Sequence, residues 1–295
     1  MMYSLLGCEN GIFVGGVQNT GRGRFDGQHH SLLRKGLQNI EQNMLSPISS
    51  SSTFLCLLCA PKELYEEPTH IVYRVLAQRK APLLRNFSLT VLFPCHPFHL
   101  HTWVDTVIER NVQQLHLAIY HFDEKLFELP RCVFTCKTVL ILKLRIDIVL
   151  DPPPSFQLPS LKILCLHKIL HRSNDSFSRL LSGCPALEDL TLESFDTYVR
   201  DFKFEIYALV LDFFRFNGDL GNFVFIENLP NLVEAIVNLG TYECILFGSI
   251  FPSNSMYQNL VRLKFEVNQF NWHVLQALLL VAPYFEVLVV IKNGY

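Results

Sequence analysis

The sequence predicts an α/β fold in the form of a solenoid, with a curved parallel β-sheet on one side and helices and loops on the convex side. First, a pattern L-x-x-L-x-L, in which other apolar residues can replace leucine, occurs eight times. Second, the copies return about every 19 to 28 residues, which is typical of leucine-rich repeats. Third, apolar residues recur at helical spacing between several copies. The copies begin at Leu84, Val112, Val139, Leu161, Leu187, Ile206, Leu232 and Leu260, and a looser ninth begins at Phe285.

The second half of each copy is expected to be a β-strand, because alternating side chains place its two apolar residues on one side. One such unit cannot bury its apolar face, so consecutive units stack and each strand pairs in parallel with the next. Nine strands at about 4.8 Å spacing give a concave sheet on the order of 40 Å along its arc. That surface is sized for a protein partner rather than for a small metabolite.

Three segments between the strands are predicted to be helices of the convex layer, at residues 103–110, 176–181 and 272–281. The repeats are irregular in one respect. The asparagine or cysteine expected three positions after the last leucine occurs only as Asn268 and Asn293. We therefore expect the turns to be held by packing rather than by a ladder of asparagine side chains.

Composition limits which partners, membrane segments and cellular locations are consistent with the sequence. The 295 residues are 49% hydrophobic and 18% charged, so the chain can bury a large core. A net charge of -2 gives no reason to expect nucleic acid or an anionic membrane as partner. No stretch has the apolar length of a signal peptide or of a membrane-spanning helix. Nine cysteines, several inside predicted strands and helices, indicate reduced thiols and a location in the cytoplasm, the nucleus or both.

The organisation of the chain changes near residue 68. Before it, glycines are scattered, Ser49 begins a run of serines, and no repeat is found. Residues 1–68 are therefore predicted to be a poorly ordered or divergent N-terminal segment. Its one apolar island, from Phe54, could dock as a short strand or helix. Residues 69–295 are predicted to form the leucine-rich repeat domain.

Motifs for chemistry are weak. Cys56 and Cys59 have the spacing of half a zinc site, but no second C-x-x-C pair exists. A loop with one cysteine and three histidines could in principle bind a metal, although a variable surface loop is the favoured interpretation; its residues are Cys95, His96, His99 and His101. No G-x-S-x-G or H-E-x-x-H motif is present. We predict a protein that is not an enzyme, with no catalytic residue, no cofactor and no metal site.

A candidate binding surface follows from the repeat geometry. The residues before, between and after the two apolar strand positions face the concave side. They carry both signs of charge, basic in the middle repeats and acidic beside them. We predict a polar groove of mixed charge that selects a protein partner by complementary charge. Its partner-binding residues are His116, Lys143, Arg145, Cys165, His167, Asp189, Thr191, Glu193, Lys264 and Glu266.

Several segments resemble a known family. They are VYRVLAQRKAPLLRNFSL, WVDTVIERNVQQLHL, LPRCVFTCKTVLILKL, LPSLKILCLHKI and FSRLLSGCPALEDLTLESF. The chain over roughly residues 71–290 is similar to the leucine-rich region of plant F-box/LRR/FBD proteins. The most specific part is the LL-S-G-CP-LE-L-L signature, carried here by Leu180 to Leu192.

The resemblance implies a function in protein recognition. In that family the leucine-rich region captures a substrate protein for ubiquitination. A preceding F-box holds the Skp-type adaptor of a cullin ligase, and the F-box subunit does no catalysis itself. Residues 1–68 show no recognisable F-box pattern, so adaptor and cullin are expected as partners only if a divergent F-box is present. The alternative is a free-standing leucine-rich scaffold, or a competitor of full-length relatives, with no ligase coupling.

Overall fold

A computed structural model describes residues 53–58, 66–78, 84–91, 95–120, 127–146, 148–171, 174–193, 204–206, 208–218, 224–226, 229–239, 257–267, 284 and 286–292. The chain divides into two units, residues 1–130 and 131–295. Each unit is built around parallel strands that follow the repeat pattern.

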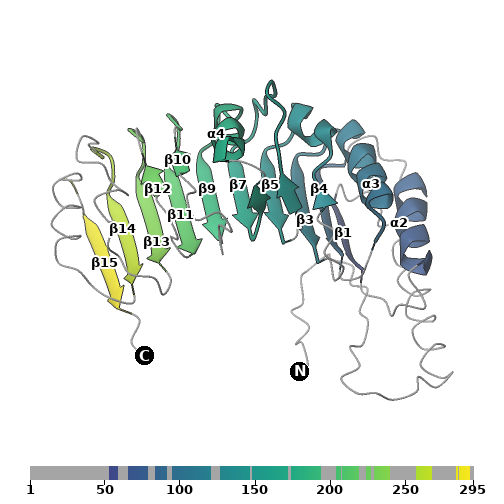
Figure 1. The fold of residues 1–295 in the computed structure, drawn as a ribbon, viewed down its shortest axis with the longest axis horizontal. Coiled ribbons are helices and arrows are strands. Elements are labelled where there is room, and N and C mark those ends of the chain that lie inside the picture. The colour runs from purple at the N-terminus through teal and green to yellow at the C-terminus, as the bar shows by residue number, and fades with distance from the viewer. Residues whose placement is uncertain are drawn as a thin grey trace, which may run out of the picture. The chain divides into compact units, whose positions relative to one another are not determined.

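The first unit contains three parallel strands in the order β1-β2-β3 and two helices (Figure 1). Helices α2 and α3 contact each other: Tyr73 meets the edge of Trp103, and Arg110 donates a hydrogen bond of 2.7 Å to the carbonyl oxygen of Leu76. The apolar island at Phe54 is strand β1, which lies before residue 69. The elements are β1 (Thr53–Leu58), α2 (Glu66–Gln78), β2 (Asn86–Val91), α3 (Pro97–Glu109), β3 (Gln114–Ile119) and the short β4 (Phe127–Glu128).

The second unit contains seven parallel strands in the order β5-β7-β9-β11-β13-β14-β15 (Figure 1). Short strands outside this sheet pair in parallel as β6 with β8 and β10 with β12. The sheet strands are β5 (Ile141–Arg145), β7 (Ile163–His167), β9 (Asp189–Glu193), β11 (Phe213–Gly218), β13 (Glu234–Leu239), β14 (Arg262–Val267) and β15 (Val287–Lys292). The others are the 3-10 helix η2 (Arg131–Thr135), β6 (Ile148–Leu150), β8 (Leu170–His171), α4 (Asn174–Ser182), β10 (Phe204–Ile206) and β12 (Val224–Ile226).

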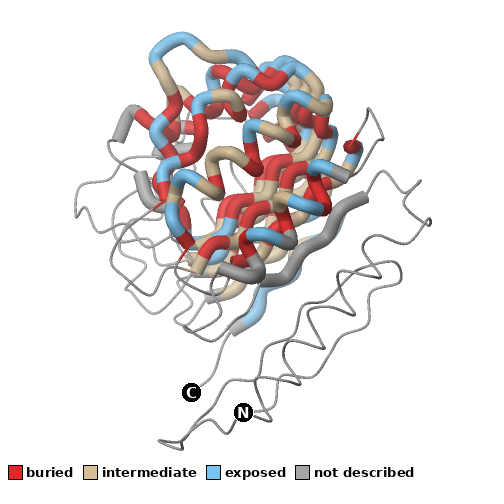
Figure 2. The backbone as a smooth tube through the Cα atoms, turned by 90° about the vertical axis from the view of Figure 1, so that its right-hand side faces the viewer, coloured by how far each residue is buried: buried red, intermediate tan, exposed pale blue. Residues whose placement is uncertain are grey.

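The two apolar positions are buried in β2, β3, β5, β7, β9, β11 and β13, as the alternation of side chains requires, whereas Val290 of the last strand, β15, is 37% exposed. Leu142 and Leu144 of β5 have no exposed surface, and the same two positions of β7 and β9 are at most 1% exposed. The positions between them are partly exposed (Figure 2). Complete burial of each leucine contributes about 1.5 to 3 kcal/mol, so these two rows form the core of the sheet. The predicted leucine-rich repeat solenoid is confirmed.

One predicted repeat was wrong in its register. The copy placed at Ile206 would bury Leu209, but the side chain of Leu209 is 69% exposed. The strand is instead β11, and the repeat begins at Leu211, which is fully buried together with Phe214. Phenylalanine takes the place of leucine at both strand positions, since Phe216 is also buried. The larger ring fills the same row of the core.

The described turns share a backbone hydrogen-bond pattern. In each, the carbonyl oxygen of a residue just before a strand accepts hydrogen bonds from two consecutive N–H groups of the next repeat. The Lys162 carbonyl, for example, accepts from Glu188 and Asp189, both at 2.9 Å. The accepting residues are Arg85, Leu140, Lys162, Glu188, Asp212, Val233 and Val261. We call this arrangement the carbonyl ladder. It needs no particular side chain, which explains how irregular repeats stack.

Side-chain rungs also join some turns, although the sequence was expected to hold them by packing rather than by a ladder of asparagine side chains. Asn268 and Asn293 lie outside the described residues. Asn231 and Asn259, each directly before the first leucine of a repeat, donate hydrogen bonds to the carbonyl oxygens of Leu209 and Pro230, at 2.6 and 2.7 Å. Ser160 occupies the same position and donates to the carbonyl of Lys137 at 2.7 Å. Polar side chains at the start of the motif therefore join some of the described turns.

Replacing Asn231 by Ala is expected to lower the free energy of unfolding by about 0.5 to 1.5 kcal/mol, because the Leu209 carbonyl loses a partner although water can reach it. Urea unfolding of the purified chain measures the change. Gln258→Ala, on an exposed neighbour of Asn259 in the same type of turn, is the control and should change stability by less than about 0.5 kcal/mol. Equal effects of the two substitutions would show that the rung contributes nothing.

The helix predictions are confirmed where they can be checked. Residues 103–110 lie almost entirely in α3, and residues 176–181 lie in α4. The helix expected at 272–281 lies outside the described residues. Within the described part of the chain, no helix has the length and apolar character needed to cross a membrane.

Candidate functional site

The strand positions that alternate with the buried rows form one face of the β5–β15 sheet, which we call the open face. It has three rows of side chains, one for each of the first, third and fifth positions of the strands. Nine of the ten residues predicted from sequence lie in these rows. The tenth, His116, takes the equivalent position on β3 of the first unit. Their placement on alternating positions agrees with the expected geometry; partner binding stays a prediction.

Charge on the open face changes from strand to strand. Strand β5 carries Lys143 and Arg145, while β9 carries Asp189 and Glu193. Strand β7 lies between them and shows His167, whose Nδ1 lies 3.3 Å from a carboxylate oxygen of Glu193. A basic strand therefore faces an acidic strand across one intervening strand.

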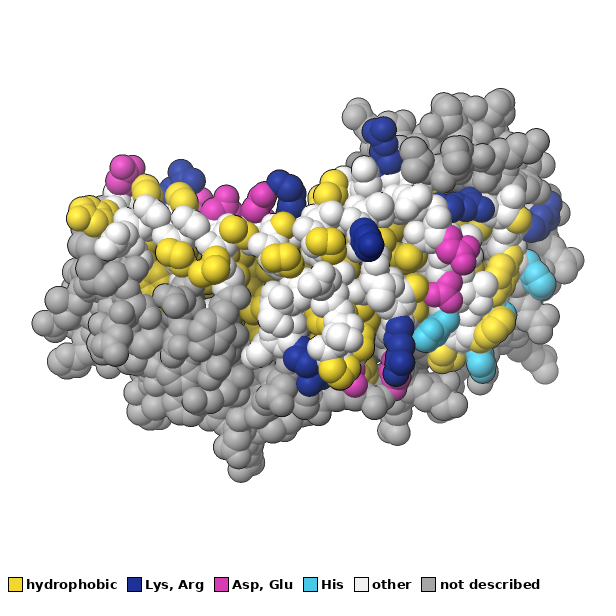
Figure 3. Space-filling view, turned by 90° about the horizontal axis from the view of Figure 1, so that it is seen from above, with side chains coloured by type: hydrophobic (Ala, Val, Ile, Leu, Met, Phe, Trp, Pro, Cys, Tyr) yellow, Lys and Arg dark blue, Asp and Glu magenta, His cyan; other side chains and the backbone are white. Residues whose placement is uncertain are grey.

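The carboxylates on the C-terminal strands are paired within the sheet. Glu266 contacts the ammonium of Lys264 and accepts a hydrogen bond of 2.9 Å from Asn238. Glu234 accepts from Arg262 at 2.8 Å, and Lys162 pairs with Glu188 at 2.6 Å just before β7 and β9. Figure 3 shows side chains of both signs following one another along one edge of the surface. Pairing neutralises these groups and makes this part of the face nearly balanced.

Arg215 is the main residue that the sequence prediction missed. It lies in the third position of β11, next to Thr191 in the register of the sheet. Its guanidinium carbon is 5.8 Å from the centre of the Phe213 ring. Its Nε is buried and has no hydrogen-bond partner among the described residues. The signal L-D-F-F-R-F, with phenylalanines in the leucine positions, would have placed it on the open face.

Asp189 sits at the edge of this charged region. Burial raises the pKa of its carboxyl above the ordinary value of 3.8, although Thr191, which donates a hydrogen bond of 3.4 Å, and the cations Arg215 and Lys143 act in the opposite direction. A raised pKa means that the ionised form of this carboxyl is less favourable in the folded state than in the unfolded state, so ionisation lowers the free energy of unfolding.

Replacing Asp189 by Asn is therefore expected to leave the chain at least as stable as the wild type at neutral pH. The favourable contribution of the raised pKa is complete below pH 3.8 and is lost as pH rises through the folded-state pKa. The stability difference between variant and wild type should thus favour the variant more at pH 7 than at low pH. Thermal melts at several pH values measure it, and a variant that is relatively less stable at neutral pH would contradict the assignment.

Five cysteines are free thiols, namely Cys95, Cys132, Cys136, Cys165 and Cys184. Cys165 lies on the open face between Lys143 and Thr191, and burial raises the pKa of its thiol. Burial also raises the pKa of Cys95 and of Cys184 to about 12. Because the thiolate is the reactive form, these side chains act as packing groups.

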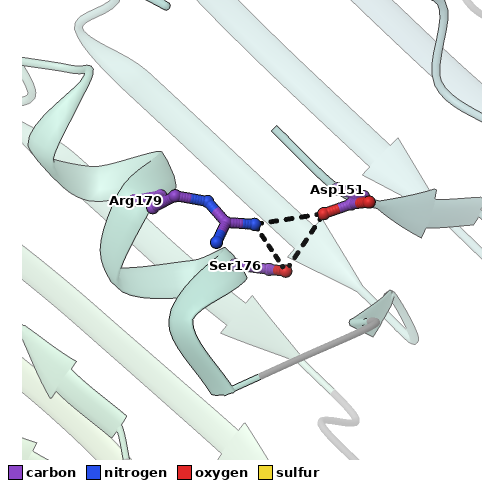
Figure 4. Close-up of polar contacts among 3 residues, drawn as sticks. All are labelled: Asp151, Ser176 and Arg179. Carbon is purple, nitrogen blue, oxygen red and sulfur yellow. Dashed lines mark hydrogen bonds and ion pairs between the residues drawn. The ribbon is translucent and has the colours of Figure 1, made fainter. Parts of the chain in front are cut away.

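A second polar cluster links strand β6 to helix α4 (Figure 4). Ser176 is fully buried and donates to a carboxylate oxygen of Asp151 at 3.4 Å. Arg179 donates to the same oxygen at 3.1 Å and to the Ser176 hydroxyl at 3.3 Å. The cluster fixes the first turn of α4 against the residue after β6, so its role is structural.

The loop considered for metal binding is also structural. The side chain of His96 caps helix α3 by accepting a hydrogen bond from the N–H of Phe98 at 3.2 Å. His99 is 2.9 Å from the Tyr73 hydroxyl and stacks on Trp103. Burial, followed by His96 and His70, lowers the pKa of His99. No group of three or more possible ligands within the described ranges has the arrangement of a metal site.

The fold and the open face together define a leucine-rich repeat protein. Residues 100–244 match the family model described as FBD-associated F-box protein At5g56370, LRR repeats. The resemblance seen in the sequence is thereby confirmed: the repeats are similar to those of plant F-box/FBD/LRR proteins. No solved structure matches the chain.

Curated relatives from Arabidopsis thaliana agree with this assignment. F-box/LRR-repeat protein At1g55660 is 37% identical over 40% of this chain and 34% of its own length. FBD-associated F-box protein At4g10400 is 32% identical over 56% of this chain and 46% of its own length. F-box protein At4g09920 is 39% identical over 40% of this chain and 37% of its own length. The aligned part of the chain spans less than half of each of these relatives.

Proposed function

We propose that the chain is a protein-interaction module whose open face captures a protein substrate for an SCF-type ubiquitin ligase. The observation that carries the proposal is the open face itself. Seven strands at about 4.8 Å spacing, each of about five residues, present a surface of about 29 by 17 Å. A surface of that size with mixed charges suits a protein partner.

The ligase connection is supported by the names of the relatives, which are F-box proteins. A Skp-type adaptor and a cullin would join the complex through a divergent F-box within residues 1–68. The role proposed for this chain is binding rather than catalysis. Reduced thiols fit a place in the cytoplasm or the nucleus.

Site-specific crosslinking tests the proposal. A photoreactive amino acid replaces Thr191 or Lys264 on the open face, or Lys137 as an exposed control away from the strands. The purified full chain is then irradiated in plant extract. We expect a protein crosslinked from both open-face positions and not from position 137, recovered together with adaptor and cullin.

Two other outcomes are informative. A partner crosslinked from the open face without adaptor or cullin would favour the free-standing scaffold or competitor. Identical crosslinks from all three positions, or none, would contradict the assignment of the open face as a binding surface.

A further inference from the structure

The charged groups of the open face are not equally satisfied. Each of its four described carboxylates has a partner in the sheet. Asp189 accepts from Thr191, Glu193 lies beside His167, Glu234 accepts from Arg262, and Glu266 contacts Lys264. On strands β5 to β11, the cations Lys143, Arg145 and Arg215 outnumber the carboxylates Asp189 and Glu193, so the net charge offered to a ligand there is positive.

Three cations of the open face stand in contrast to these carboxylates. Within the described residues, Lys143, Arg145 and Arg215 form no ion pair or side-chain hydrogen bond, apart from the contact of Arg215 with the Phe213 ring. The Arg215 Nε is buried, and a buried donor without a partner is costly.

The register sets the distance between these cations. Lys143 pairs with Cys165, Cys165 with Thr191, and Thr191 with Arg215, so all four side chains lie in one row across strands β5, β7, β9 and β11. Three steps between strands correspond to about 14 Å between the row ends. The side chains between the two cations are the small, uncharged Cys165 and Thr191, which leave room above them.

From this row we infer that the open face binds an extended acidic peptide segment of its partner, with two carboxylates placed to meet Lys143 and Arg215. An extended chain rises about 3.4 Å per residue, so about 14 Å corresponds to acidic residues four positions apart. Arg145, on the same strand as Lys143, adds positive charge at that end. The guanidinium of Arg215 can bind one carboxylate through two parallel hydrogen bonds. The inference rests on the proposed function, because it names the partner segment for the same face.

Peptide selection tests the inference. A random library of twelve-residue displayed peptides is selected on the purified full chain, and enriched sequences are compared with those selected on variants. Selected peptides should contain Asp or Glu at positions i and i+4, and a synthetic peptide of that pattern should bind at least tenfold more weakly to Lys143→Gln or Arg215→Gln. Binding should also weaken as salt is raised.

Lys137→Gln is the matched control, because it removes the same charge from an exposed lysine that lies away from the sheet strands. Its affinity for the acidic peptide should stay within about twofold of the wild type. Circular dichroism of each variant shows that the fold is kept.

The possible failures are distinguishable. Selected peptides without acidic residues, whose binding nevertheless competes with a partner crosslinked from the open face, would overturn the inference and leave the proposed function in place. The same holds if Lys137→Gln weakens binding as much as Arg215→Gln. A wild-type chain that selects no peptide and crosslinks no partner from the open face would overturn both.

Discussion

Replacing Leu211 by Ala is expected to lower the free energy of unfolding by about 2 to 5 kcal/mol, whereas replacing Leu209 by Ala should change it by less than about 0.5 kcal/mol. The two residues are two positions apart and carry the same side chain. Leu211 is fully buried and begins the repeat that continues into β11, while Leu209 is 69% exposed in the preceding turn. Only the first substitution leaves a cavity.

Urea unfolding of the two variants measures the difference, and the side chains are chemically matched, so each serves as the control of the other. Two results would contradict the register of β11. One is a large loss at Leu209, which would return the repeat to Ile206. The other is a small loss at Leu211. In either case Arg215 would leave the open face, and the inferred pair of cations would be lost with it.

Replacing Gly183 by Ala is the second substitution expected to have a large effect on stability. Its neighbour Phe156 lies so close that a Cβ on Gly183 would be 2.5 Å from the ring atoms Cε2 and Cζ. The ring is partly buried and packs edge-on against the fully buried Phe134 at 5.5 Å between centres, so a shift of the ring disturbs that contact. Gly183→Ala is therefore expected to cost about 1 to 3 kcal/mol of folding free energy, through overpacking.

A second substitution separates this contact from backbone effects. In a Phe156→Leu background the ring is absent, so Gly183→Ala should cost clearly less than in the wild type. The difference between the two costs is the coupling energy of a double-mutant cycle. Additive effects would mean that the ring is not the reason for glycine in the G-C-P signature. Gly183 has an ordinary negative φ, so freedom of the backbone does not explain its presence.

Most of the fold could be predicted from sequence because the repeat states the same physical requirement many times. A buried residue at alternate positions of a parallel strand has to be apolar, and that requirement fixes the phase of most strands. The phase failed near Ile206, where I-Y-A-L-V-L and L-D-F-F-R-F both satisfy an apolar pattern. The pattern I-Y-A-L-V-L has more leucine, which favoured it in the sequence analysis. The structure instead buries the apolar residues of L-D-F-F-R-F, since phenylalanine can fill the leucine rows.

The candidate site was predictable in composition but not in pairing. Alternation alone placed residues such as Lys143 and Asp189 on the partly exposed rows. The cross-strand neighbours of Glu193 and Glu266, which are His167 and Asn238, depend on strand register, which is set by turns of unequal length. The polar rungs were not predicted, for a similar reason. Asn231, at the start of its repeat, donates a hydrogen bond to the carbonyl oxygen of Leu209 in the preceding turn, and the repeat pattern does not indicate this contact.

The carbonyl ladder has a consequence for how such proteins can change over generations. Each rung joins one turn only to the next and uses main-chain atoms. Loss of one whole turn, such as the stretch from Leu187 to the residue before Leu211, would bring the Lys162 carbonyl opposite the N–H groups of Asp212 and Phe213. Those groups already donate to an equivalent oxygen, that of Glu188. Gene segments that encode single turns can therefore be duplicated or deleted with the stacking preserved. The order of charges across the strands would change in one step.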